Sequence, residues 1–385
     1  MAGIYVHVPF CSRFCTYCNF YSVKGAGYRE QYIQSLESEM EFRKEFFKNK
    51  GVSPHTIYFG GGTPSLLPAE VLGRLLHRII STFNASPEEI SIEVNPNDIT
   101  QEYAESLRKA GFNRVSMGVQ SFVDEHLLWM NRRHKAAEGE EAFHNLRAAG
   151  FNNISLDLIF GYQGLTDELW QYNLETITSL LPEHISAYQM SIEPGSALGK
   201  MYERGEYDLV PDEICKNQYA ALQDYLGRSG YAQYEISSFA RRNPEGELLK
   251  SRHNSSYWTK EPYLGLGPAA HSYDGKTRFW NHPSVAKYCR CYPGKSGIIS
   301  PENLAKAGGY EELQGRDIFN ESVMLGLRTV EGVDTSLLDA GMLREAMSEI
   351  RRHIRLGNLI QDGVKIRIPS ERLFVSDGII RDLFV

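Results

Sequence analysis

Three cysteines within eight residues near the start of the chain have the spacing that most directly indicates chemistry. Cys11, Cys15 and Cys18 follow a short apolar run, and the Pro and aromatic residues around them favour a tight loop. A loop of this length can place thiolates around an inorganic centre, and a cubic iron–sulfur cluster takes one thiolate per iron. Three thiolates leave one iron without a protein ligand, as catalytic metal sites generally leave one position open. We therefore predict a [4Fe–4S] cluster with one open iron.

Two simpler interpretations compete with the cluster. The first is a structural zinc site with His7 as the fourth ligand, although the run His-x3-Cys-x3-Cys-x2-Cys lacks the two-pair spacing usual for zinc. The second is a set of unligated thiols, and thiols spaced this closely seldom lack a ligand or a bridge in a cytosolic protein. The spacing favours the cluster over both.

Length and composition set the class of protein. The chain has 385 residues, enough for about two domains, and its 42% hydrophobic and 23% charged residues are typical of a soluble globular protein. A net charge of −7 disfavours a nucleic-acid partner. No apolar run is long enough for a transmembrane helix, and the N-terminus lacks the basic region of a signal peptide. Because the remaining cysteines suggest no disulfide framework, we expect a cytoplasmic protein.

Alternating strand and helix patterns must position these residues. Strands are expected at 3–9, 56–59, 90–94, 114–119, 154–160 and 185–192, with helical patterns between them. Six such alternations in about 200 residues predict an α/β fold, a partial six-unit (β/α) barrel, because a closed eight-unit barrel needs about 250 residues. The predicted domains are the barrel at 1–210, a helix followed by a loop-rich connecting region at 211–300, and a small, mainly helical, winged-helix-like domain at 301–385.

The carboxyl ends of barrel strands usually carry the functional side chains. The stretch Gly60-Gly61-Gly62-Thr63-Pro64 is expected at one of them, and its glycines would allow a ligand to approach the backbone closely. Carboxylates accept hydrogen bonds from hydroxyl groups, and an arginine offers a fork for a carboxylate. A turn, a cap or a surface ion pair would explain any one such residue, but a set of them on successive strand–helix units indicates a binding site more specifically. The other members of the set are Glu93, Gln120, Arg132 and Asp157.

The cysteine pattern, with Tyr17 before its last cysteine, resembles that of the radical S-adenosylmethionine (SAM) superfamily. In that superfamily the amino and carboxylate groups of SAM chelate the open iron, and an electron from the cluster cleaves SAM to a 5′-deoxyadenosyl radical. The resemblance therefore implies an electron donor and a barrel of the radical SAM type. It also implies SAM contacts from Tyr5, Tyr17, Gly61, Gly62, Thr63, Glu93, Gln120, Arg132 and Asp157.

A closer resemblance is to the oxygen-independent coproporphyrinogen III oxidase family, through the runs at 5–10, 60–64, 91–96, 116–121 and 156–161. The match covers the barrel and continues more loosely to the C-terminus. Two departures separate the chain from the oxidases themselves. Phe20 stands where they carry a further cysteine, and the long N-terminal arm that contributes to their substrate site is absent before Cys11. Both departures favour the haem-chaperone branch of the family over porphyrinogen decarboxylation.

The run His253-Asn254-Ser-Ser-Tyr257-Trp258 matches a motif of that branch. An imidazole can ligate haem iron, and two aromatic rings can lie against a porphyrin face. The alternative is a loop histidine that caps backbone groups beside packed aromatic rings. His271, although it too matches the family, is expected to be buried and structural. Cys289 and Cys291 are expected to be solvent-facing and non-essential.

The resemblance implies a haem chaperone that binds a [4Fe–4S] cluster, SAM and haem. Its partners would be respiratory haem proteins that accept haem, membrane-bound ones included, so that transient membrane association is compatible with a cytoplasmic location. The alternatives are the oxidase and a non-catalytic protein structured by zinc. The sequence leaves open whether SAM is cleaved, which residue ligates haem, which protein receives it, and the oligomeric state.

Overall fold

Seven parallel strands form the centre of a twelve-stranded sheet in the computed structural model, which describes residues 2–25, 27–294, 299–300 and 306–385. Six of them follow the chain order predicted for a partial barrel, and the expectation of an α/β fold of this type is confirmed. The seventh, β11, pairs with β1 on its other side. The parallel strands stand in the order β11 (Tyr263–Leu266), β1 (Ala2–Val8), β4 (Pro54–Gly61), β5 (Glu89–Val94), β6 (Arg114–Gln120), β7 (Ile154–Phe160) and β8 (His184–Gln189).

These strands are covered on both faces, as parallel strands usually are. In β1 every residue except Tyr5 is buried, and β7 shows the same pattern with Asp157 as its exception. A polar side chain on such a strand needs a partner or a function, because burying it without one is costly. Tyr5 and Asp157, the exceptions on the two strands, therefore indicate where a functional site would lie.

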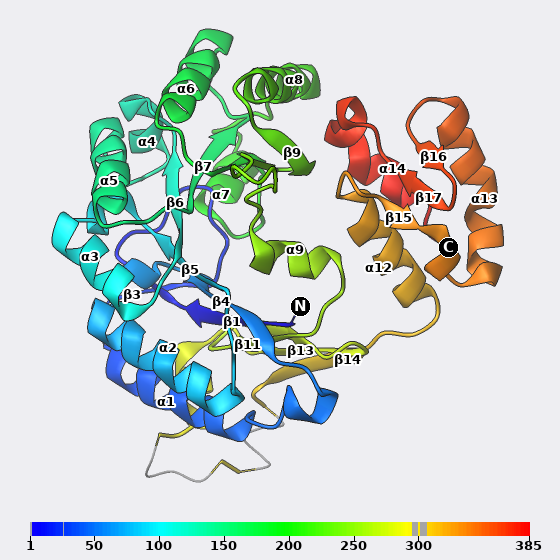
Figure 1. The fold of residues 1–385 in the computed structure, drawn as a ribbon. Helices are drawn as coiled ribbons and strands as arrows, with labels where there is room; N and C mark the ends of the chain where they lie inside the picture. The colour runs from blue at the N-terminus through cyan, green and yellow to red at the C-terminus, as the bar shows by residue number, and fades with distance from the viewer. Residues whose placement is uncertain (1, 26, 295–298, 301–305) are drawn as a thin grey trace.

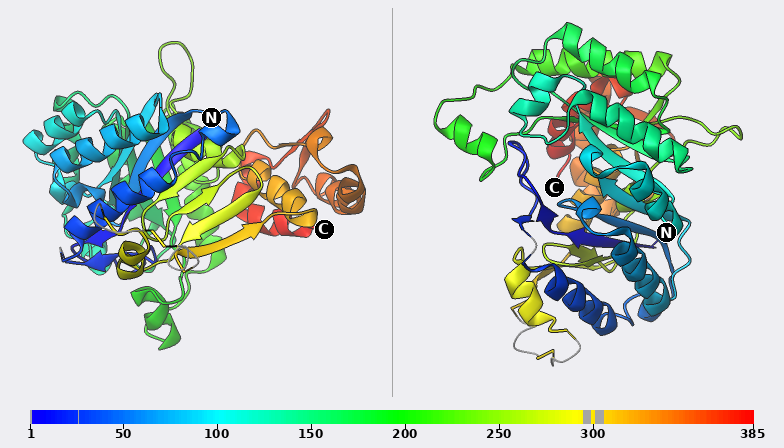
Figure 2. Two further views of the ribbon diagram at one scale, coloured as in Figure 1. Left: turned by 90° about the horizontal axis from the view of Figure 1, so that it is seen from below. Right: turned by 90° about the vertical axis from the view of Figure 1, so that its left-hand side faces the viewer.

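Helices cover the outer side of the curved sheet (Figure 1). They begin where the sequence offers caps: the hydroxyl of Thr100 accepts the amide of Tyr103, and Thr166 accepts that of Leu169. The covering helices are α1 (Arg29–Phe42), α2 (Ala69–Phe83), α3 (Gln101–Ala110), α4 (Asp124–Trp129), α5 (Ala136–Ala148), α6 (Asp167–Ser179) and α8 (Asp212–Arg228). The shorter α7 (Ala197–Glu203), green in Figure 2, projects from the layer of covering helices but buries Leu198 in the core.

In the predicted loop-rich region, the described residues 241–294 and 299–300 are not dominated by loops, which corrects the sequence-based expectation. This segment contains α9 (Arg252–Trp258), β11, β12 (His271–Tyr273), β13 (Thr277–Asn281) and α10 (Val285–Cys291). Together with β14 (Gly308–Glu312), its strands extend the sheet beyond β1. At the other edge, β10 (Ser238–Ala240) pairs with β8 and β9 (Ala232–Glu235). Strands of three to five residues between Gly and Pro turns give no periodic signal, and β11 pairs with a strand some 260 positions earlier.

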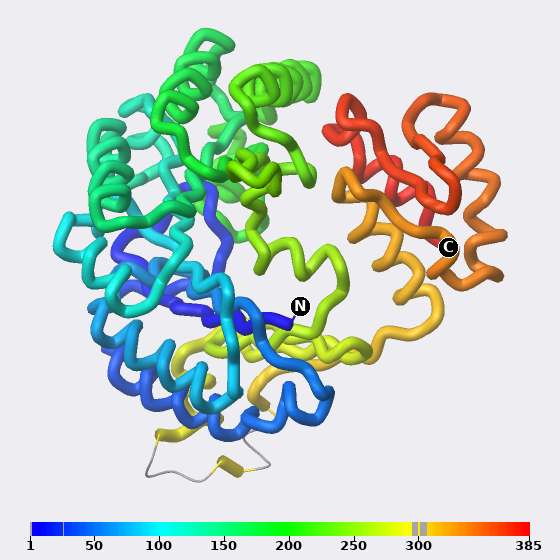
Figure 3. Tube along the Cα trace, viewed as in Figure 1, coloured from blue at the N-terminus to red at the C-terminus, as the bar shows by residue number. Residues whose placement is uncertain are grey.

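The C-terminal elements lie across the open side of the sheet from α8, with α9 between them and β11 (Figure 1). The tube in Figure 3 shows the chain leaving β14 and passing to α12. A small sheet in the order β15-β17-β16 packs with the helices of this part. Its elements are α12 (Arg316–Leu327), β15 (Val333–Asp334), α13 (Ala340–Arg355), β16 (Ile360–Asp362), β17 (Lys365–Arg367) and α14 (Ser376–Asp382). The boundaries between the three predicted domains, after residues 210 and 300, stay a prediction. Residue 301, where the third domain is predicted to begin, lies outside the described residues.

Candidate functional site

The cysteine loop, residues 11–18, is held from two sides. It begins at β2 (Phe10–Cys11), which pairs with β3 (Val23–Lys24) beyond the loop. The amide of Thr16 donates to the carbonyl of Met130 at 3.1 Å, and its hydroxyl donates to that of Trp129 at 2.9 Å. On the other side, the amide of Leu198 in α7 donates to the carbonyl of Thr16 at 2.8 Å. The backbone that carries the thiols is therefore fixed before any ligand binds.

The thiols of Cys11, Cys15 and Cys18 are half-exposed, and none of them forms a disulfide. Burial raises the pKa of Cys18 to about 11, and the neighbouring Cys15 and Cys11 add to the rise. Among the described residues, the one group of three ligating side chains whose atoms all lie within 4.8 Å is in the C-terminal part. At least one pair of the three sulfurs is therefore more than 4.8 Å apart, beyond the roughly 3.8 Å between two sulfurs on one tetrahedral zinc ion, which disfavours a single zinc ion bound by all three thiols.

His7 does not serve as a fourth ligand in this arrangement. The ring is buried, its Nε2 lies 2.9 Å from the carbonyl oxygen of Tyr21, and its Nδ1 lies 3.2 Å from the hydroxyl of Tyr5. Both nitrogens are therefore used inside the protein. The zinc interpretation loses the ligand on which it depended.

The glycine stretch at the end of β4 packs against the cysteine loop. A Cβ on Gly62 would lie 2.7 Å from the carbonyl oxygen of Phe10, and Gly61 has a φ of 106°. Only glycine fits a left-handed position and so close a backbone approach. The hydroxyl of Thr63 and the thiol of Cys11 are 3.5 Å apart. The stretch therefore holds the start of the cysteine loop, and the amide of Gly62 is already donated to Val8 at 2.8 Å.

Two carboxylates lie inside the barrel. Glu93, near the end of β5, accepts the hydroxyl of Tyr58 at 2.9 Å and the amide of Gly61 at 3.1 Å. Burial raises the pKa of Glu93 to about 7, and the charge of Asp157 adds to the rise. Burial likewise raises the pKa of Asp157 to about 6, against hydrogen bonds from serines such as Ser116. Asp157 lies in the middle of β7 and not at its carboxyl end, which corrects the sequence-based placement.

Arg132 links the cysteine loop to the ends of β5 and β6. Its guanidinium donates to the thiol of Cys15 at 3.4 Å, to the carbonyl of Gly118 at 2.6 Å, and to the side chain of Asn95. Its Nε–H is buried without a partner among the described residues, so an acceptor on a bound molecule would satisfy it. Gln120, at the end of β6, adopts a φ of 70° beside a register shift between β6 and β7. A strained, non-glycine backbone of this kind often marks a functional position.

A cavity of about 600 Å³ opens inside the barrel beside these groups. This volume is in the range of roughly 300–1,000 Å³ that is usual for cofactor sites. Of the predicted residues, Tyr5, Glu93, His253 and Tyr257 line it, whereas Tyr17 packs against the core. Sequence reasoning missed much of the lining. The cavity residues not assigned to a ligand from the sequence include Phe20, Tyr21, Tyr58, Tyr188, Lys260, Tyr263, His271, Tyr273, Arg278, Glu321 and Leu325.

His253 reaches the cavity wall but is sealed within it, with 1% of its surface exposed. Its Nδ1 lies 2.8 Å from the hydroxyl of Thr56, and its Nε2 lies 2.8 Å from that of Tyr257. Trp258 does not line the cavity; its ring lies under the guanidinium of Arg328, 5.5 Å from the ring centroid. Of the three ring-bearing side chains of the motif, His253 and Tyr257 therefore line the cavity and Trp258 does not. Both ring nitrogens of His253 are already hydrogen-bonded within the protein.

Two expectations about other residues are wrong. His271 is exposed on β12 and lines the cavity, because this short strand borders the open interior. Cys289 and Cys291 are buried in α10, because this helix packs against α1 and the core and does not lie in a solvent-exposed loop. Their burial raises the pKa of both thiols, which disfavours the thiolate.

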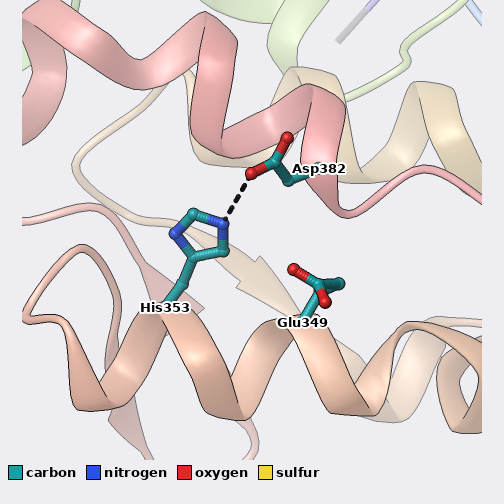
Figure 4. Close-up of side chains that lie close together, drawn as sticks. All are labelled: Glu349, His353 and Asp382. Atoms are coloured by element: carbon teal, nitrogen blue, oxygen red, sulfur yellow. Dashed lines mark hydrogen bonds and ion pairs between the residues drawn. The ribbon is translucent and has the colours of Figure 1, made fainter.

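A second cluster of ligating side chains lies in the C-terminal part (Figure 4). His353 Nε2 faces a carboxylate oxygen of Asp382 at 3.2 Å, with Glu349 one helical turn away. Arg352 already pairs with both carboxylates, at 2.6 Å to Glu349 and 2.7 Å to Asp382. The arginine supplies the positive charge that a cation would bring. The cluster is therefore an ion-pair network that joins α13 to α14.

Comparisons with known proteins show the family of the chain. Residues 5–176 match the family model of the radical SAM superfamily. The haem chaperone HemW of Mycobacterium tuberculosis is 32% identical over 99% of this chain and 94% of its own, and HemW of Bacillus subtilis is 34% identical over 86% and 85%. A mitochondrial relative, radical S-adenosyl methionine domain-containing protein 1 of Danio rerio, is 31% identical over 86% of this chain and 74% of its own.

A solved structure shows the same fold. The coproporphyrinogen III oxidase HemN of Escherichia coli, described as a radical SAM enzyme, superposes with a TM-score of 0.81 and covers 100% of this chain and 90% of its own. Its identity to this chain is 23%, so the likeness concerns the fold alone. Among the described residues, no helix combines the length and the apolar character needed to cross a membrane.

Proposed function

This chain belongs to the radical SAM superfamily, in the family of the HemW proteins, and on that premise we propose that it is a haem chaperone. Membership of the superfamily implies a [4Fe–4S] cluster and SAM. The further steps proposed are that the chain binds haem and passes it to respiratory haem proteins. HemW relatives matched over most of the chain support this assignment.

The central cavity is the observation that carries the proposal. It lies next to the cysteine loop, since Asn19 and Phe20 directly follow the last cysteine and line it. Phe20 leaves 69% of its surface exposed in the protein without ligand. Tyrosine is the commonest residue type in the remaining wall, and ligand sites are usually lined by aromatic and apolar side chains with a few placed polar groups. A flat aromatic macrocycle fits such a lining.

Cys11, Cys15 and Cys18 are the proposed cluster ligands. When bound, the cluster supplies a one-electron reductant beside the sulfonium of SAM. The nine SAM contacts expected from the sequence are retained as proposals, with roles set by the geometry. Glu93 and Asp157 are placed to accept hydroxyl groups from inside the barrel, and Arg132 holds the loop against β6. The rings of Tyr5 and Tyr58 stack with centroids 6.1 Å apart, and both line the cavity together with Glu93.

The partners follow from this chemistry. A reduced cluster requires an electron donor, and a haem carrier requires an acceptor protein, which in a respiratory chain is often membrane-bound. The net charge of −7 gives no support to a nucleic-acid partner. We propose a cytoplasmic protein that associates with membranes only through its acceptor.

Haem transfer from the reconstituted protein tests the proposal. Anaerobically purified protein should be brown with equal amounts of iron and sulfide, bind one haem, and restore the absorbance of a haem-free respiratory cytochrome in membrane vesicles. Formation of a divinyl product from coproporphyrinogen III would instead identify an oxidase. A colourless protein containing zinc would overturn the cluster as well.

A further inference from the structure

Three histidines line the central cavity, and they differ in whether a ring nitrogen is available. Both nitrogens of His7 and both nitrogens of His253 are hydrogen-bonded to groups of the protein, and both rings are buried. His271 is exposed, and its nitrogens have no hydrogen-bond partner among the described residues. A haem iron could coordinate His271 without any internal hydrogen bond being broken.

The surroundings of His271 hold its ring in one orientation. The imidazole stacks on the indole of Trp280 in the neighbouring strand β13, with centroids 5.6 Å apart and an interplanar angle of 24°. Stacking fixes the ring plane and leaves both nitrogens free. Burial, with the charge of Arg278 as a second cause, lowers the pKa of His271, so the ring is neutral near pH 7. A neutral imidazole is the form that ligates a metal.

Other protein ligands for haem iron are thiolate, thioether and tyrosinate. No cysteine or methionine lines the cavity among the described residues. The tyrosines are poor candidates because burial raises the pKa of Tyr58, Tyr257 and Tyr263, which keeps them protonated. His271 is the side chain that remains.

A cation lies on the same cavity wall. Lys260 follows α9 in a left-handed conformation, φ 58°, and its ammonium donates to the hydroxyl of Ser322 at 3.0 Å, with no hydrogen bond to a carboxylate. Arg278, the other cavity cation, already pairs with Glu311 and Glu321. The charge of Glu321 acts on Lys260 without a hydrogen bond between the two side chains. A ligand carboxylate would add a charge-assisted hydrogen bond, which is among the stronger kinds.

We propose that His271 is the axial ligand of the bound haem iron and that Lys260 pairs with a haem carboxylate. This inference rests on the proposed function, because it names the residues that hold the cargo. It differs from the sequence-based expectation, which offered His253 as a residue able to ligate haem iron and left the identity of the ligand open.

Spectra of the reconstituted full chain with Fe(III) protoporphyrin IX test the ligand. The His271→Gly variant should lose the Soret position and the electron paramagnetic resonance signal of the histidine-ligated wild type, and millimolar imidazole should restore both. His253→Gln, which retains a hydrogen-bonding side chain, should keep the wild-type spectrum. His144→Gly, an exposed position on the outer helix α5, is the matched control.

A second arm tests Lys260 without depending on the stability of the variant. Lys260→Gln should weaken binding of haem roughly tenfold to a hundredfold, as expected for the loss of one charged hydrogen bond, and leave binding of haem dimethyl ester unchanged. An equal effect on both ligands would overturn this contact.

Two outcomes are distinguishable. If the wild type binds haem through histidine and His271→Gly keeps that spectrum, the ligand assignment is wrong and the proposed function stands. If the wild type binds no haem, the proposed function is overturned and this inference with it.

Discussion

The imidazole of His253 and the hydroxyl of Thr56 lie 2.8 Å apart, the first on α9 and the second on β4. Gly3 on β1 makes room for the pair, since a Cβ there would lie 2.8 Å from the Thr56 hydroxyl and 3.1 Å from the imidazole. The amide of His253 also donates to Glu89 at the start of β5. The histidine of the motif therefore ties α9 to three neighbouring strands.

Replacing His253 by alanine should destabilise the protein before any haem is considered. The change leaves the buried hydroxyl of Thr56 unpaired and creates a cavity, which together cost about 2–4 kcal/mol. Urea unfolding of the ligand-free protein measures the loss. Asn254→Ala, at a half-buried position on the same helix, should stay within about 0.5 kcal/mol of the wild type. Equal stability of the His253 variant would contradict the structural role.

The raised pKa of Glu93 predicts that the free energy of unfolding depends on pH. Its folded pKa of about 7 lies above the ordinary value of 4.5, so the folded state holds the proton more tightly than the unfolded chain. The stabilisation of the folded state by protonation of Glu93 is complete below pH 4.5 and is lost as the pH rises to 7. At about 1.4 kcal/mol per pH unit, the loss approaches 3 kcal/mol. The free energy of unfolding of Glu93→Gln should fall less over this window; parallel curves for the two proteins would disprove the assignment.

The barrel could be predicted because its signals are local. Each of the strands β1, β4, β5, β6, β7 and β8 is a short apolar run followed by a helical pattern, and parallel strands buried on both faces carry that signal strongly. The strands β11 to β14 could not be predicted, because they are three to five residues long and owe their place to β11, which alone of the four pairs with β1. The missed part of the fold is the part that forms one wall of the cavity.

The site residues likewise divide into those that the sequence could predict and those that it could not. The predictable ones stand in motifs whose residue types directly indicate their chemistry, as for Cys11, Glu93 and Arg132. His271 stands in an ordinary Gly-Pro-Ala-Ala-His run, and only its position on an exposed face of β12 shows that its nitrogens are available. The exposure of a side chain on an edge of the cavity depends on tertiary packing, which the spacing of residues does not encode.

Gly62→Ala should damage the site through the backbone. The new Cβ would lie 2.7 Å from the carbonyl oxygen of Phe10 and 2.9 Å from that of Val8, and neither atom can move without shifting the cysteine loop. Such overpacking costs about 1–3 kcal/mol. Thermal unfolding and the iron content after anaerobic reconstitution should both fall. Gly227→Ala, in α8 with open space around it, should raise stability by about 0.5–1 kcal/mol. A Gly62 variant with full iron content would refute the close approach.

Arg132→Lys should separate cluster binding from SAM binding. A lysine keeps the charge but not the fork that reaches Cys15, Asn95 and Gly118 together. We expect iron and sulfide contents near those of the wild type and roughly tenfold weaker SAM binding in equilibrium dialysis. Arg147→Lys is the matched control, because its guanidinium also has a carboxylate and a carbonyl as partners, Glu183 at 2.8 Å and Leu181 at 3.0 Å, and neither belongs to the cysteine loop. Unchanged SAM affinity would remove Arg132 from the proposed site.

Phe20 offers the sharpest test of the cavity as a haem site. An aromatic ring that is 69% exposed contributes little to the stability of the free protein, but it gains burial if a macrocycle covers it. Phe20→Ala should therefore leave urea unfolding of the ligand-free chain unchanged and weaken haem binding roughly tenfold, the effect of about 1.4 kcal/mol of lost contact. Leu128→Ala, at a 76% exposed position on α4 outside the cavity, should change neither quantity. If the Phe20 variant bound haem as tightly as the wild type, the porphyrin would have to lie elsewhere, because no macrocycle could fill this cavity without covering that ring.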